Sequence, residues 1–122
     1  MDTVHATTVV INDIGVLLRG RSGSGKSDLA LRLIEGGARL VADDQTILEY
    51  SDGRVEARAP DNLRNKIEVR NLGVVTLPDD SMARVGILGL IVDLVESQDQ
   101  LDRMPVPETI ELGGVTVRRL RL

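Results

Sequence analysis

The sequence of 122 residues has no cysteine, phenylalanine or tryptophan, and Tyr50 is its single tyrosine. Without cysteine, disulfide bonds and thiolate metal sites are excluded. A lone aromatic ring offers no platform on which successive bases could stack. The net charge of −4 also argues against a protein that binds a phosphate backbone. We therefore expect no nucleic-acid partner.

The sequence also lacks a long hydrophobic run and a basic N-terminus. The apolar run GILGLIV at residues 86–92 is far shorter than the roughly 20 residues of a membrane-spanning helix. The first Lys or Arg is Arg19, so the N-terminus does not look like a secretion signal. These features predict a cytoplasmic protein with no membrane contact.

The length predicts one domain over residues 1–122. Apolar residues make up 42% of the chain, enough for a core built from aliphatic side chains.

Hydrophobic periodicity predicts one helix among about eight strands. In residues 27–35, Leu29 and Leu33 lie one turn apart and form an apolar stripe, and two glycines follow as a helix stop. Because β structure follows the helix, without the regular alternation of strand and helix, the fold class should be α+β with a mixed or antiparallel sheet. Strands are expected within residues 7–18 (two, turning at 12–13), 38–42, 45–50, 54–59, 67–77 (with Gly73 as a break or bend), 84–95 and 109–120 (a hairpin).

The segment GRSGSGKS, residues 20–27, matches the phosphate-binding pattern G-x-x-x-x-G-K-[ST]. Glycines allow successive amides to point inward, and the start of the following helix adds positive potential. The alternative is an ordinary Gly/Ser turn, but the position between a predicted strand and a helix favours phosphate binding. The predicted nucleotide-binding residues are Gly20, Arg21, Ser22, Gly23, Ser24, Gly25, Lys26 and Ser27, with the Ser27 hydroxyl placed to hold Mg²⁺.

Two acids, Asp43 and Asp44, end the predicted strand that follows the helix. Side chains alternate along a strand, so at most one of them should point straight at bound phosphates. Carboxylates beside a nucleotide either hold Mg²⁺ or accept a hydroxyl proton. The alternative is an acidic turn between strands.

Three other positions carry weaker signals. Glu68 and Arg70 lie two residues apart, on one strand face, where a solvated pair is an equally good interpretation. His5 alone is typical of a surface residue near a terminus, and Arg103 alone is typical of a loop cation.

Taken together and in order, these segments resemble the catalytic domain of the HPr kinase/phosphorylase family. The family places a His 21 residues before the loop lysine, as His5 stands before Lys26. Its loop resembles GRSGSGKS, and its next motifs resemble ARLVADD, EVRNLGVV and LDRM in this chain. The resemblance extends from His5 to Arg103.

The resemblance implies a fold similar to phosphoenolpyruvate carboxykinase. It also implies an ATP- and Mg²⁺-dependent kinase that phosphorylates a serine of HPr, the phosphocarrier of the sugar phosphotransferase system. By position, Lys26 would neutralise charge on the transferred phosphoryl group, and Asp44 would take the proton of the serine hydroxyl. The remaining implied roles are Ser27 and Glu68 as Mg²⁺ ligands, His5 and Arg103 as further catalytic residues, and Asp43 and Arg70 as supporting residues.

The chain departs from the family pattern in several places. It begins almost at His5, which suggests a short, catalytic-only form, and it stops before the family's dephosphorylation loop and its HPr-docking helix. Kinase activity is therefore expected, while phosphorylase activity and a homo-oligomer are left open. Asn71 replaces a family glycine, and Arg21 replaces a loop acid. The alternatives are a non-catalytic sensor that binds ATP or phosphate, and a small-molecule kinase or carboxykinase relative.

Overall fold

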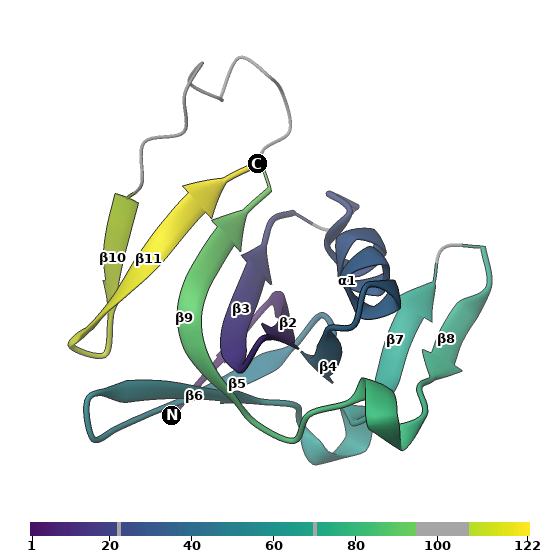
Figure 1. The fold of residues 1–122 in the computed structure, drawn as a ribbon, viewed down its shortest axis with the longest axis horizontal. Helices are drawn as coiled ribbons and strands as arrows, with labels where there is room; N and C mark the ends of the chain where they lie inside the picture. Colours follow the sequence, from purple (N-terminus) through teal and green to yellow (C-terminus); the bar gives the residue numbers. More distant parts are fainter. Residues whose placement is uncertain (22, 70, 95–107) are drawn as a thin grey trace.

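The structure, a computed structural model, describes residues 1–21, 23–69, 71–94 and 108–122. In these ranges a single α-helix, α1, packs against a large mixed β-sheet, and a separate two-stranded hairpin lies beside the helix (Figure 1). The predicted α+β class, with one helix in a mixed sheet, is confirmed. No helix in these ranges is long and apolar enough to span a membrane.

The helix and strands largely follow the predicted segments. They are β1 Asp2–Val4, β2 Ala6–Ile11, β3 Ile14–Arg19, α1 Lys26–Glu35, β4 Arg39–Ala42, β5 Thr46–Ser51, β6 Arg54–Arg58, β7 Lys66–Val69, β8 Gly73–Thr76, β9 Gly86–Asp93, β10 Glu108–Leu112 and β11 Val115–Arg121.

Strand β9 holds the large sheet together. The strand order is β1-β5-β6-β9-β3-β2-β4, and β11 pairs with β9 while β10 pairs with β11. Both β3 and β11 run parallel to β9. Strand β6 pairs antiparallel with the first residues of β9. As a result, the C-terminal ends of β3, β9 and β11 lie together at the edge of the sheet where the glycine-rich loop begins (Figure 1).

The sheet has a hydrophobic core on each face because apolar residues run continuously through its central strands. In β3, Val16 and Leu18 pack with Ala30 of α1, while Leu17 belongs to a second core cluster with buried residues of β5 and β6. This is the pattern of strands that are covered on both faces. The helix is therefore held firmly over β2 and β3, which fixes the position of its N-terminus.

The segment 67–77, predicted as strand with a break or bend at Gly73, is broken into two strands. It forms the hairpin β7–β8, because Asn71 and Gly73 adopt left-handed backbone, with φ of 68° and 97°. Ile67 is fully buried in the helix-side core and anchors the hairpin there. Residue Arg70, predicted to share a face with Glu68, lies outside the described residues.

An ion cluster joins the ends of β3, β9 and β11. Arg19 binds the Asp93 carboxylate through Nε (2.7 Å) and Nη2 (2.9 Å), and Arg119 donates from Nε to the same carboxylate. Leu94 N also donates to Arg19 O at 2.8 Å. Burial alone would raise the pKa of Asp93, but the hydrogen bonds and charges of the two arginines outweigh it and lower that pKa below its ordinary value. The cluster thus fixes the point at which the chain leaves β3 for the glycine-rich loop.

We predict that Asp93→Asn destabilises the protein at pH 7 by about 1–3 kcal/mol, because Arg19 loses the carboxylate that it binds twice and Arg119 keeps only its bond to Glu108. A carboxyl whose pKa is lowered by folding stabilises the fold when the pH is above its pKa in the unfolded chain. This contribution is lost as the pH falls through its pKa in the folded protein. The difference between wild type and variant should therefore shrink below about pH 4. Urea unfolding at pH 7 and pH 3 measures the difference in the free energy of unfolding. The control is Asp52→Asn, a change at an exposed turn residue. An undiminished difference at pH 3 would contradict this assignment.

Candidate functional site

The glycine-rich loop connects the end of β3 to the start of α1. Gly23 and Gly25 have φ of 82° and 98°, a left-handed backbone that glycine adopts at little cost. A Cβ at either position would meet no atom within 4 Å, so the requirement for glycine lies in the backbone conformation and not in crowding. Gly25 is the N-cap of α1. The backbone amides of the loop therefore lie next to the positive end of the helix.

Lys26 is folded back onto this loop. The residue is only 6% exposed, and its Nζ donates to the carbonyl oxygens of Gly20 (2.8 Å) and Arg21 (3.2 Å). An ammonium group has three N–H donors. With two bound to the loop carbonyls, the third suits a phosphate oxygen at the loop surface.

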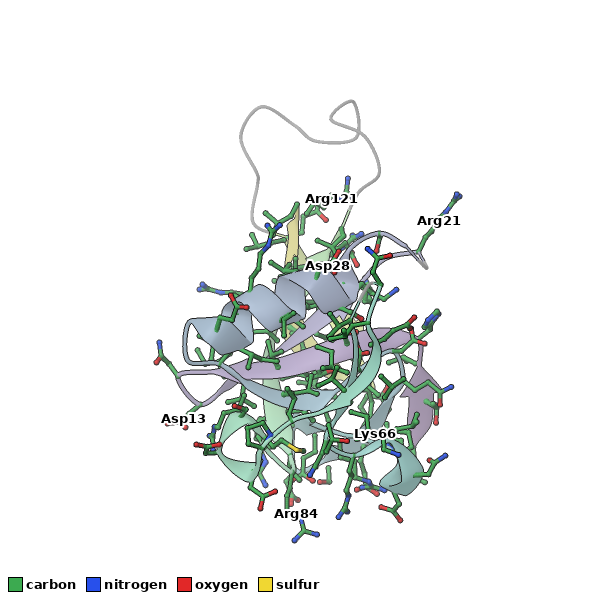
Figure 2. The ribbon with its side chains drawn as sticks, turned by 90° about the vertical axis from the view of Figure 1, so that its right-hand side faces the viewer. Asp13, Arg21, Asp28, Lys66, Arg84 and Arg121 are labelled. Atoms are coloured by element: carbon green, nitrogen blue, oxygen red, sulfur yellow. The ribbon has the colours of Figure 1, made fainter. Side chains whose placement is uncertain are left out.

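Ser24 and Arg21 complete the described part of the loop. The Ser24 hydroxyl is buried and has no hydrogen-bond partner among the described residues. A buried hydroxyl of this kind is unusual, and it fits a loop that completes its hydrogen bonds with an anion. The exposed Arg21 side chain extends away from the fold, whereas Asp28 lies at the loop end of α1 (Figure 2). Ser22 lies outside the described residues.

Asp43 is buried behind the loop and connects three elements. Its Oδ1 accepts hydrogen bonds from Thr7 Oγ1 (2.9 Å) and Ser27 Oγ (2.7 Å), and its Oδ2 accepts one from the backbone N–H of Glu68 (2.9 Å). It therefore joins β2, the first turn of α1 and β7 through one carboxylate.

Asp44 points to the surface, and strand alternation is not the reason, because β4 ends at Ala42 and both acids lie beyond it. Its side chain is 56% exposed, and its Oδ1 lies 2.5 Å from His5 Nε2, which donates to it. The backbone of Asp44 is left-handed, with φ of 67°. Asp43 and Asp44 are therefore adjacent in sequence but divided between the interior and the surface.

A cavity of about 270 Å³ lies beside the loop. All of its lining residues except Asp28 and Asn71 belong to the predicted site. The lining residues are Gly23, Gly25, Lys26, Ser27, Asp28, Asp44, Glu68 and Asn71. The structure thus brings Lys26 of the loop, Asp44 just beyond β4 and Glu68 of β7 to one cavity, and it places His5 against Asp44.

Two predicted site residues cannot be placed at the cavity, and the cavity and its surroundings include residues that the sequence did not indicate. Arg103 and Arg70 fall outside the described residues. Asp28 could have been anticipated, since it directly follows the loop motif at the start of the helix, and Asn71 drew notice only as a turn residue. Thr7 carried no signal, because threonine is common in strands.

The donors around the cavity fit Mg²⁺ bound together with phosphate. Across the described ranges, no group of three or more His, Asp or Glu side chains gathers to hold a metal ion. Mg²⁺ in phosphate-binding sites usually takes one or two protein oxygens and completes its shell with phosphates and water. Ser27 and Glu68 both line the cavity, and a hydroxyl and a carboxylate are oxygen donors of this kind.

Comparison with known proteins gives consistent matches along the chain. The family model described as HPr Serine kinase C-terminal domain matches residues 1–122. HPr kinase/phosphorylase of Bordetella petrii is 40% identical over 130 residues, covering 98% of this chain and 42% of that protein. The same-named protein of Neisseria meningitidis is 38% identical over 128 residues, covering 97% of this chain and 40% of that protein.

A solved structure is also similar. The Hpr(Ser) kinase/phosphatase from Coxiella burnetii matches with a TM-score of 0.92 and 28% identity, over 100% of this chain and 85% of that chain. The chain thus spans about 42% of the length of the Bordetella relative but most of the Coxiella chain.

Proposed function

The chain belongs to the HPr serine kinase C-terminal domain family, and on that premise we propose that it is an ATP- and Mg²⁺-dependent kinase acting on a serine of an HPr-type phosphocarrier protein. The observation that carries the proposal is the shared cavity of Lys26, Ser27, Asp44 and Glu68. A phosphate-binding loop and an accessible carboxylate facing one cavity are what transfer from a nucleotide to a hydroxyl requires.

In this proposal the loop amides and Lys26 bind the outer phosphates of the nucleotide. The serine oxygen forms a bond to the γ-phosphorus, the bond from that phosphorus to the β–γ bridging oxygen breaks, and the serine proton passes to Asp44. Ser27 and Glu68 would hold Mg²⁺, which supplies charge neutralisation between the phosphates when bound. Most of the barrier reduction comes from positioning and charge stabilisation.

Of the two neighbouring acids, Asp44 is the better base. Asp43 is 7% exposed and already accepts three hydrogen bonds from the protein, so a substrate hydroxyl has little access to it. The Asp44 side chain is 56% exposed, and its contact with His5 uses Oδ1, which leaves Oδ2 to accept from a serine hydroxyl. His5 would thus orient the carboxylate of the base.

The test is transfer to the acceptor protein itself. Wild-type protein, Mg²⁺, ATP and HPr are mixed, and intact mass and fragmentation show whether HPr gains one phosphoryl group on serine. We expect the gain, and we expect none with chelator present or with HPr whose acceptor serine is alanine. Tight ATP binding with no mass change in HPr would instead indicate the non-catalytic sensor.

A further inference from the structure

We propose that Thr7, on β2, is a positioning residue that holds Asp43 and Asp44 in their working orientations, an inference that rests on the proposed kinase function. Thr7 is fully buried. Its hydroxyl donates to Asp43 Oδ1 at 2.9 Å and accepts from the backbone N–H of Asp44 at 3.1 Å. One hydroxyl therefore contacts both acids and uses its donor and its acceptor together.

The position of Thr7 explains why such a contact is needed. The pairing of β2 with β4 ends at Thr8 opposite Ala42, with a register irregularity between Thr8 and Val9. Asp43 and Asp44 follow directly beyond this last backbone pair. The Thr7 side chain continues the connection between the strands where the backbone ladder stops.

Asp44 depends on this connection because of its backbone. Its φ of 67° is uncommon for a residue other than glycine, and it belongs to a tight turn in which Gln45 N donates to Asp43 O at 2.8 Å. The bond from Asp44 N–H to the Thr7 hydroxyl fixes this turn. With the turn fixed, the Asp44 carboxylate faces the cavity and His5.

Through Asp43, Thr7 also acts on the proposed Mg²⁺ ligands. The oxygen of Asp43 that Thr7 contacts also accepts from Ser27 Oγ, and the other oxygen accepts from Glu68 N–H. Loss of the Thr7 hydroxyl would let this carboxylate rotate away from both.

The neighbouring Thr8 is a matched control. It is also fully buried in β2, but its hydroxyl pairs with Thr46 Oγ1 at 2.9 Å, and Thr46 Oγ1 donates to Ala6 O at 2.9 Å. A Thr→Val change at position 7 or 8 removes the same hydroxyl from the same strand. Only the change at position 7 also removes the contacts with Asp43 and Asp44.

The experiment compares Thr7→Val, Thr7→Ser and Thr8→Val in the full chain. Thr7→Val should lower kcat for HPr phosphorylation by roughly 10²-fold, the scale of a misplaced reacting group. The KM for ATP should change less than kcat, because Lys26 and its bonds to the carbonyls of Gly20 and Arg21 are untouched. Thr7→Ser should restore most of kcat, and Thr8→Val should stay near wild type. Amide hydrogen exchange, read by NMR without nucleotide, should accelerate at Asp44 in Thr7→Val by roughly tenfold or more and not in Thr8→Val, since exchange reports local opening.

Equal loss of kcat in the two valine variants, or no recovery in Thr7→Ser, would overturn the inference. Unchanged exchange at Asp44 in Thr7→Val would also overturn it. If Thr7→Val does not fold, Thr7→Ala takes its place in the same comparison. A wild-type protein that binds ATP but transfers nothing would end the kinase proposal, while the exchange comparison would still decide whether Thr7 holds the Asp44 backbone.

Discussion

Asp44→Asn is expected to lower kcat for HPr phosphorylation by roughly 10²- to 10⁴-fold, the usual contribution of a positioned general base. Asparagine keeps the size of the side chain and tolerates the left-handed backbone that Asp44 adopts, with φ of 67°. Nucleotide binding should be retained, because the loop and Lys26 are unchanged. Asp44→Ala should lose at least as much activity and should also strain the turn. Single-turnover transfer from labelled ATP gives the rate, and calorimetry gives the nucleotide affinity.

A variant of a second acid in the same cavity serves as a control. It shows whether a lower rate comes from the loss of negative charge or from the loss of the base. Asp28 lies in the first turn of α1 (Figure 2). It is also one of the residues that line the cavity. Asp28→Asn removes one negative charge there without removing the proposed base, so its effect on kcat should be much smaller than that of Asp44→Asn. Transfer that survives Asp44→Asn at near the wild-type rate would show that Asp44 is not the base.

Lys26→Ala should damage both nucleotide binding and transfer. The ammonium is buried against the carbonyls of Gly20 and Arg21, so its removal takes away a cation and leaves two loop acceptors unpaired. A charged hydrogen bond contributes about 1.5–3 kcal/mol, which corresponds to a Kd for ATP raised roughly 10- to 100-fold. The charge that develops on the transferred phosphoryl group would lose its nearest cation, so kcat should also fall by roughly 10²-fold or more.

Lys66→Ala is the control for this change, because Lys66 is the only other lysine in the chain. Lys66 is exposed at the first position of β7, and it is not among the residues that line the cavity. It should leave affinity and transfer near wild type. Equal losses in the two lysine variants would point to a general effect of charge and not to a phosphate contact at Lys26.

The parts of the site that sequence could predict are those encoded by local backbone chemistry. The loop at residues 20–27 and the helix after it follow from the spacing of glycines, lysine and aliphatic residues, and the structure places them as expected. The alternation of side chains along a strand predicts that at most one of Asp43 and Asp44 points straight at bound phosphates. The structure does separate the two acids, but through the left-handed backbone of Asp44 beyond the end of β4. Which acid would face the cavity was given by the family resemblance and not by the alternation.

The parts that sequence could not predict depend on contacts between distant segments. Thr7 and Asp43 are 36 residues apart, and Arg19 and Asp93 are 74 residues apart. Neither pair has a local pattern, because a buried threonine in a strand and a charged residue at a strand end are both common. For the hairpin β7–β8, the sequence predicts only a break or bend at Gly73, because the left-handed backbone that turns the chain at Asn71 is one of several conformations open to asparagine.

The central claim is that the terminal phosphoryl group of a nucleotide bound at Lys26 lies within reach of Asp44. A crystal structure of the protein with Mg²⁺ and a non-hydrolysable ATP analogue measures this directly. The γ-phosphorus should lie roughly 6 Å from the Asp44 carboxylate, with room between them for one serine oxygen. A nucleotide bound away from the loop, or a γ-phosphate that faces away from Asp44, would contradict the kinase proposal.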